Sequence, residues 1–244
     1  MSARKWHLMR IIISGGTGID ARESFSEVDV TDTSSPVRRG AGRPTREQAE
    51  ARHSELLDTA LDLFLEHGFQ VATIEMIAAR VGMTKRTVYG LYADKAALFG
   101  AAVQRAIERQ NVPPTTLESF DRGDVADTLE AIAKLRIGQV MTPNGLRLQR
   151  IINTESYRFP EILTANYEQA AKPVIEFVAG LLDRAVAAGT IAPTDTALAA
   201  TAFMSMVVGG QVRAIVSGRT ITPEAIDRQV HFTVHLLLDG LRPR

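Results

Sequence analysis

The spacing of apolar positions along residues 56–110 predicts four consecutive helices. Apolar side chains between Leu57 and Leu65 recur at the intervals of three and four residues that give a helix one apolar face. The glycine within Glu66–Phe69 is expected to end this first helix. A second stripe, at positions 74, 77, 78 and 81, predicts a short helix that Thr73 caps and Gly82 closes.

Two more helices are predicted after very short connections. Thr84 is expected to cap a third helix, which has Val88 and Tyr92 on its inner face. Asp94 is expected to cap a fourth helix over Lys95–Gln110. Two short helices joined by a turn of two or three residues form a helix-turn-helix, whose second helix enters the major groove of DNA. An ordinary helical hairpin with a solvated charged face is the alternative interpretation.

Cations at the starts of these helices favour DNA over that alternative. Lys85 and Arg86 lie in the first turn of the third helix, and Lys95 lies in the first turn of the fourth. An exposed cation at a helix N-terminus meets the positive end of the helix dipole, and each such cation destabilises the helix by about 0.3–1 kcal/mol. Three such residues on two neighbouring helix starts are consistent with a bound polyanion, and DNA is the polyanion we expect.

Residues 56–99, LLDTALDLFLEHGFQVATIEMIAARVGMTKRTVYGLYADKAALF, resemble the TetR family of transcriptional regulators without gaps. The matching positions are Ala60, Phe64, Gly68, Thr73, Ile77, Ala78, Gly82, Thr84, Thr87, Tyr89, Tyr92, Lys95 and Leu98. The resemblance implies an all-α fold with an N-terminal three-helix DNA-binding domain and a C-terminal helical bundle for effector binding and dimerisation. It implies a homodimeric repressor, with no enzymatic activity and no cofactor, that binds a palindromic operator and is released by a small, largely apolar effector. A transcriptional activator or a ligand-independent regulator on the same scaffold is the alternative.

Two positions depart from the usual family pattern. Arg86 stands where many members carry glycine, and Leu91 stands where many carry histidine. Arginine can make a bidentate contact to guanine that is worth about 1–3 kcal/mol of discrimination. Leucine, in contrast, removes a phosphate donor, so the operator contacts need not copy those of other members.

The predicted DNA contacts fall into two groups. Lys85, Arg86 and Thr87 are expected to face the base edges, whereas the other residues are expected to bind phosphates and position the backbone. Tyr92 has core packing as an equal alternative, because it shares the face of Val88. The predicted DNA-binding residues are Arg43, Arg46, Thr73, Thr84, Lys85, Arg86, Thr87, Tyr89, Tyr92 and Lys95.

Residues 1–42 are predicted to be a disordered or flexible extension that ends in a basic arm, ahead of a DNA-binding domain at 43–106 and an effector domain at 107–244. The run PVRRGAGRPTR at residues 36–46 holds four arginines and no acid, and Arg43 and Arg46 are expected to reach a minor groove.

The run MRIIISGGTGID, which contains Gly15–Gly18, resembles a phosphate-binding loop. The helix and second strand that a nucleotide-binding enzyme needs do not follow it. A start codon assigned too far upstream would also explain an unstructured N-terminal extension.

The rest of the chain is predicted to be helical, over residues 124–141, 144–157, 161–188, 195–217 and 223–241. Prolines at 143, 160, 193 and 223 fall near the predicted starts, where proline is tolerated. Pro173 falls inside the third of these helices and is expected to bend or split it. The region from Tyr167 to Ser217 loosely resembles the C-terminal domains of AefR-like regulators.

Apolar and aromatic residues of this half are candidates for an effector pocket, although ordinary core packing is the simpler interpretation of each. The candidates are Ile151, Tyr157, Phe159, Tyr167, Phe177 and Phe203. The last two helices are predicted to form a two-fold dimer contact, because residues 197–208 are almost entirely apolar or small. The predicted interface residues are Phe203, Met206, Gly209, Gly210, Val230, Val234, Leu237 and Leu241.

Composition adds further expectations. The 28 basic and 28 acidic residues give a net charge of zero, whereas a protein that coats DNA nonspecifically is expected to be strongly basic. No cysteine is present, and no apolar run approaches the length of a membrane helix, so a soluble cytoplasmic protein is expected. His231 and His235 stand at chelating spacing, but no third ligand accompanies them, so core or interface packing is favoured and no metal site is predicted.

Overall fold

The computed structural model describes residues 45–121, 123–216 and 221–243, and every regular element in these ranges is a helix, as the sequence predicts. The chain divides into two units, residues 1–49 and 50–244. The glycine-rich run near the N-terminus and Arg43 lie outside the described residues. None of the described helices is long and apolar enough to cross a membrane.

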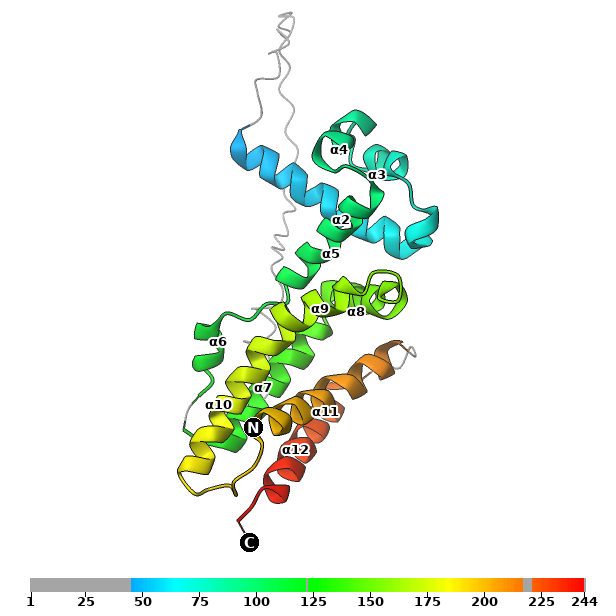
Figure 1. Ribbon diagram of the computed structural model, residues 1–244. Coiled ribbons are helices and arrows are strands. Elements are labelled where there is room, and N and C mark those ends of the chain that lie inside the picture. The colour runs from blue at the N-terminus through cyan, green and yellow to red at the C-terminus, as the bar shows by residue number, and fades with distance from the viewer. Residues whose placement is uncertain (1–44, 122, 217–220, 244) are drawn as a thin grey trace, which may run out of the picture. The chain divides into compact units, whose positions relative to one another are not determined.

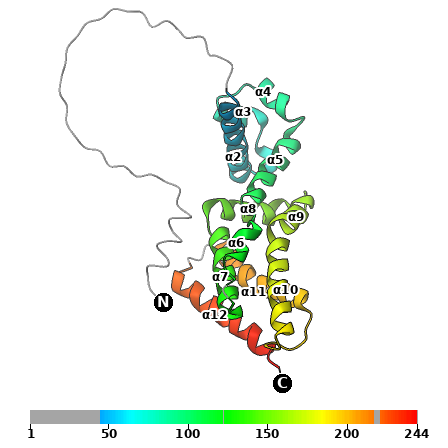
Figure 2. The same cartoon turned by 90° about the vertical axis from the view of Figure 1, so that its left-hand side faces the viewer.

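The first four helices follow the predicted order. They are α2 (Arg46–Val71), α3 (Ile74–Arg80), α4 (Lys85–Leu91) and α5 (Lys95–Glu108). The helical φ/ψ values of α2 break at Gly68, which has a φ of 76° that glycine adopts without steric cost. In Figures 1 and 2, α3 and α4 lie together beside α2 and the start of α5. We call residues 50–95 the head.

The remaining helices are α6 (Pro114–Glu118), α7 (Val125–Val140), α8 (Pro143–Glu155), α9 (Glu161–Asn166), α10 (Lys172–Ala187), α11 (Thr196–Val216) and α12 (Pro223–Gly240). The sequence analysis missed only the short α6 among the described helices. Helices α10 and α11 pack along each other, and α7 packs against both α11 and α12 (Figure 1). We call residues 107–244 the effector domain, as the sequence analysis delimits it.

The predicted helix 161–188 is helical through residues 161–187, with a change of helix type just before Pro173 instead of a break. A π-helical turn, η1 (Tyr167–Ala171), separates α9 from α10, and Pro173 occupies the first turn of α10. Proline has no N–H for the bond to the residue four positions earlier, and its ring clashes with that carbonyl. The wider π turn accommodates the missing bond, so the chain continues as a helix instead of stopping.

Two apolar clusters form the interior. The first joins α2, α3, α4 and α5 to α8 and α9, and the second joins α7, α10, α11 and α12. The first cluster contains four phenylalanine rings that contact one another: Phe64, Phe69, Phe99 and Phe159. Phe69 lies in the last turn of α2 and Phe159 precedes α9, so this cluster links the head to the effector domain.

Candidate nucleic-acid interface

Threonine caps set the two helices of the helix-turn-helix. The hydroxyl of Thr73 accepts a hydrogen bond from the backbone N–H of Met76, at 3.2 Å, and starts α3. The hydroxyl of Thr84 accepts one from the N–H of Thr87, at 3.1 Å, and starts α4. The side chains of Thr84 and Thr87 also bond to each other, at 2.8 Å between their oxygens. These hydroxyls therefore hold the helix starts in place before any DNA contact.

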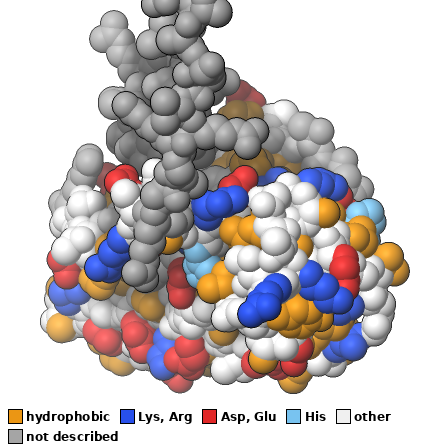
Figure 3. All heavy atoms as spheres, turned by 90° about the horizontal axis from the view of Figure 1, so that it is seen from above, with side chains coloured by type: hydrophobic (Ala, Val, Ile, Leu, Met, Phe, Trp, Pro, Cys, Tyr) orange, Lys and Arg blue, Asp and Glu red, His pale blue; other side chains and the backbone are white. Residues whose placement is uncertain are grey.

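Lys85 and Arg86 stand exposed in the first turn of α4, but their surroundings differ. Lys85 forms an ion pair with Glu75 of α3, and its Nζ lies 5.6 Å from the centre of the Tyr89 ring. The hydrogen bond to Lys85 lowers the pKa of the Glu75 carboxyl, and the same bond raises the pKa of Lys85. Arg86 makes no hydrogen bond or ion pair within the described residues. Figure 3 shows Lys and Arg side chains on the face at this end of the molecule.

Replacing Glu75 by glutamine is expected to raise the affinity for random duplex DNA. The substitution frees Lys85 to bind a phosphate, which should steepen the salt dependence by about one unit of log K against log salt. Salt-dependent titrations of a random duplex measure this change. Glu66→Gln is the matched control, since Glu66 is a similarly exposed acid of the same head. Equal effects of the two substitutions would contradict the role of Glu75 in holding Lys85.

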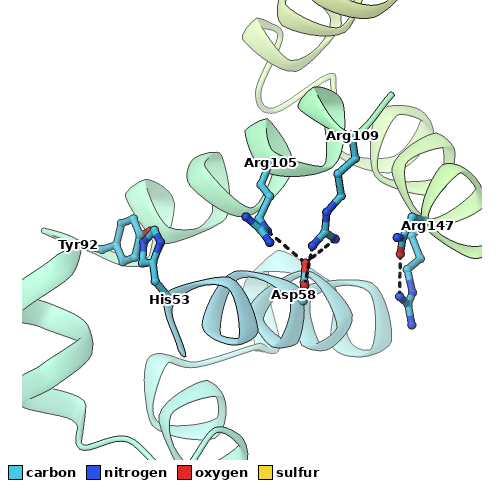
Figure 4. Close-up of polar contacts among 7 residues, drawn as sticks. His53, Asp58, Tyr92, Arg105, Arg109 and Arg147 are labelled. Atoms are coloured by element: carbon cyan, nitrogen blue, oxygen red, sulfur yellow. Dashed lines mark hydrogen bonds and ion pairs between the residues drawn. The ribbon is translucent and has the colours of Figure 1, made fainter. Parts of the chain in front are cut away.

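Tyr92 caps the C-terminal end of α4 and contacts His53 of α2 (Figure 4). Its hydroxyl lies 2.6 Å from Nε2 of His53, and the two rings stack with centroids 6.0 Å apart. Burial raises the pKa of the Tyr92 hydroxyl. Tyr92 is half buried and its ring packs on His53, which is the packing alternative in part, while its phosphate contact stays a prediction. The sequence analysis missed His53, because no local signal connects residues 39 positions apart.

Lys95 is engaged inside the head. Its Nζ donates hydrogen bonds to the carbonyl oxygens of Gln70 and Ala72, both at 3.1 Å, and lies 4.7 Å from the centre of the Phe69 ring. These carbonyls lie at the end of α2 and just beyond it, where a helix leaves acceptors without partners. Lys95 therefore fastens the end of α2 to the start of α5, a role that the sequence analysis did not foresee.

Replacing Lys95 by methionine is expected to destabilise the head by about 1–2 kcal/mol, since hydrogen bonds from a charged group contribute in this range when partly exposed. The melting temperature measured by circular dichroism checks this expectation. Weaker DNA binding with an unchanged melting temperature would instead support the phosphate contact that the sequence predicts.

Two ion-pair groups connect α2 to later helices (Figure 4). The carboxylate of Asp58 accepts two hydrogen bonds from Arg109, at 2.7 and 2.8 Å, and Nε of Arg105 lies 3.6 Å from it. Asp62, one turn later, pairs with Arg147 of α8 at 3.0 Å. The head is thus tied to the end of α5 and to the effector domain by charged contacts as well as by the phenylalanine rings.

The comparisons with known proteins agree with this arrangement. Residues 56–102 match the family model described as "Bacterial regulatory proteins, tetR family", and residues 127–240 match that of the "AefR-like transcriptional repressor, C-terminal domain". The chain belongs to the TetR family of transcriptional regulators. These regulators bind DNA through a helix-turn-helix and form a non-enzymatic class.

Individual relatives fit the same family. The transcriptional regulator YdeS of Bacillus subtilis is 37% identical over 41% of this chain and 50% of its own length, so the match spans half of that relative. Mb1581 of Mycobacterium bovis is 29% identical over 62% of this chain and 71% of its own. The structure of the flavonoid-responsive regulator FrrA superposes with a TM-score of 0.63 at 28% identity, over 80% of this chain and 99% of that one. A TetR-family regulator from Mesorhizobium loti has a TM-score of 0.67 at 23% identity, over 82% of this chain and 100% of that one, which shows the fold.

The candidate pocket residues of this TetR-family chain do not gather at one place. Tyr157 is 98% exposed and Tyr167 is exposed, so neither lines an enclosed pocket. Ile151 belongs to the first apolar cluster and Phe203 to the second, while Phe177 packs beside the second. Phe159 lines a groove of about 140 Å³ between α5 and α9, together with Phe99, Val103 and Ile162.

The predicted dimer residues also divide by burial. Phe203, Val230 and Val234 are buried in the second cluster of the same chain, which leaves them no surface for a second copy. Gly210 faces α12 of its own chain, because a Cβ there would lie 3.2 Å from Nε2 of Gln229. Four other predicted residues are half buried: Met206, Gly209, Leu237 and Leu241. For α11, the helical period could not show which face points inward, because residues 197–208 are almost entirely apolar or small.

Proposed function

We propose that this protein is a homodimeric, cytoplasmic transcriptional repressor that binds a palindromic operator and is released by a small, largely apolar effector. The observation that supports operator binding is the start of α4, where Arg86 and Lys85 are exposed on a helix that Thr84 caps. An arginine without an internal partner is available for a bidentate contact to guanine, and a lysine beside it can supply a second donor.

Selection of operators from random duplexes tests this function. A two-fold protein is expected to select an inverted repeat whose half-sites lie about one turn of DNA apart, roughly 34–36 Å, or a multiple of that spacing. A screen for compounds that release the bound duplex then tests the effector part. The absence of any preference for an inverted repeat over bulk genomic fragments at moderate salt would contradict the proposal.

Arg86→Ala is expected to weaken operator binding by about 1–3 kcal/mol and to relax selectivity at one base pair of each half-site, because a bidentate guanine contact has this value. Gel-shift titrations with the selected operator and with single-base variants measure both effects. Unchanged affinity together with unchanged preference would show that Arg86 does not read a base.

The exposed face of α12 supports the dimer. Its exposed positions recur at helical spacing, and the two large apolar side chains among them, Phe232 and Leu236, are 66% and 52% exposed. These two side chains lie one turn apart on the same exposed face, so together they offer a candidate contact surface. A second copy of the chain suits it, because the same face then meets itself across a two-fold axis. This face takes the place of the buried residues Phe203, Val230 and Val234 in the proposed interface.

The groove between α5 and α9 supports an apolar effector. Four of the residues that line it are Phe99, Val103, Phe159 and Ile162. Phe159 also contacts Phe69 of the head, with ring centres 4.9 Å apart. A compound that moves Phe159 would therefore reach the head directly. FrrA, which is flavonoid-responsive by its name, is consistent with an aromatic effector.

A further inference from the structure

Arg136 of α7 is a buried cation without an acidic partner. The residue is only 7% exposed, and within the described residues it forms no ion pair. Its Nη1 donates hydrogen bonds to the backbone oxygen of Gln110, at 3.2 Å, and to Oε1 of Gln139, at 2.6 Å. Burial lowers the pKa of the guanidinium to about 10. A buried charge normally has a counter-ion, because desolvation is costly without one.

One edge of the guanidinium lacks hydrogen-bond partners among the described residues, and we call it the open edge. Among the described residues, the buried Nε atom has no hydrogen-bond partner and Nη2 makes no hydrogen bond, so both bonds to the protein use Nη1. The N–H groups of Nε and Nη2 point in the same direction along one side of the planar group. This spacing matches the two oxygens of a carboxylate, which arginine binds in a bidentate manner. The open edge is therefore the one that suits an oxyanion.

The surroundings favour a monoanion with an apolar body. Residues one turn away on the buried face of α7, Ile132, Ala133 and Val140, are almost completely buried. One carboxylate would neutralise one guanidinium, whereas a phosphate dianion would leave a buried negative charge uncompensated. Gln139 accepts only from Nη1, so a carboxylate on the edge formed by Nε and Nη2 leaves this hydrogen bond in place.

We propose that Arg136 binds the carboxylate of an acidic small-molecule effector whose remainder is largely apolar. This inference rests on the proposed function, since it names the chemical class of the effector that the effector domain binds. Arg136 does not line the groove between α5 and α9, so the proposal places the carboxylate at a separate, charged point of the effector domain.

Direct binding to the full-length protein tests the proposal. The probes are benzoate and octanoate, with benzamide and octanamide as their neutral counterparts, and binding is measured by isothermal titration calorimetry. At least one acid is expected to bind the protein ten times or more as tightly as its amide. Arg136→Met is expected to reduce the affinity for this acid to that for the amide. Arg184→Met is the control, because Arg184 is an exposed arginine of the same domain that pairs with Asp121.

Several results would overturn the proposal: no probe binds, acids bind no better than amides, inorganic phosphate displaces the acid, or Arg136→Met retains the affinity for the acid. A cooperative melting curve shows whether Arg136→Met folds. If it does not, Arg136→Lys keeps the charge but lacks the bidentate edge, and a drop of at least threefold in affinity for the acid is expected. Operator binding of the unmodified protein is measured separately, without the acids. A protein that binds no operator contradicts the proposed function, whereas a protein that binds an operator but no acid contradicts only the proposal for Arg136.

Discussion

Replacing Phe232 by glutamate is expected to turn dimers into monomers at micromolar concentration and to abolish tight operator binding. The Phe232 ring is 66% exposed on α12, and burying a phenylalanine side chain contributes about 1.5–3 kcal/mol. A two-fold contact contains the residue twice, so the loss doubles, and two buried carboxylates add a further penalty. Light scattering measures the mass in solution, and gel shifts measure binding to the selected operator.

The matched control is Leu163→Glu. Leu163 of α9 is also a large apolar residue, 50% exposed, but it lies on neither α11 nor α12. This variant is expected to remain dimeric. The proposed interface would be wrong if Phe232→Glu remained dimeric, or if both variants dissociated alike. The melting curve of Leu163→Glu should match that of the unmodified protein, because Leu163 does not belong to the buried core. Phe232→Glu should still melt cooperatively, at a temperature lowered only by the stabilisation that association supplies.

The sequence predicted the helices well because their starts depend on local chemistry. Thr73, Thr84 and Asp94 each accept a backbone hydrogen bond from the first turn of the helix that follows, as their positions led us to expect. Pro143 and Pro223 occupy first turns for the same local reason. Such signals need only three or four neighbouring residues, so one chain reveals them.

The contacts of individual site residues could not be predicted in the same way. The carbonyl oxygens that Lys95 binds lie 23 and 25 residues earlier, and the carboxylate that Arg109 binds lies 51 residues earlier. Apolar spacing likewise identifies an apolar stripe on a helix, but it does not show which other helix packs against that stripe. The stripe of Val230 and Val234 faces the chain's own core, while Phe232 and Leu236 face outward. Only the packing of α12 against α7 and α11 decides between them.

Arg136 shows a third limit of sequence reasoning. It lies on the buried face of α7 between Ile132 and Val140, where a helical pattern alone predicts an apolar side chain. Arginine is seldom buried without a counter-ion, so a lone cation in such a position tends to be treated as exposed. Its burial and its open edge emerge only from the assembled fold.

Replacing Phe99 by alanine is expected to destabilise the protein by about 3–5 kcal/mol, the usual cost of removing a fully buried phenylalanine. Phe99 is 1% exposed, and its ring centre lies 5.0, 5.2 and 4.9 Å from those of Phe64, Phe69 and Phe159. Because these rings link the head to the effector domain, the cavity should also weaken the coupling between them. Denaturant unfolding measures the loss, and the concentration of a releasing compound needed to free the operator measures the coupling.

Phe99→Leu separates the volume of the side chain from its aromatic contacts. Leucine fills most of the space, so the free energy of unfolding should fall much less than with alanine. The edge contacts with Phe64 and Phe69 are lost in both variants, at about 0.5–1.5 kcal/mol per aromatic pair. A loss below about 1 kcal/mol for the alanine variant would show that this site collapses around the cavity, and that the ring cluster does not hold the head to the effector domain.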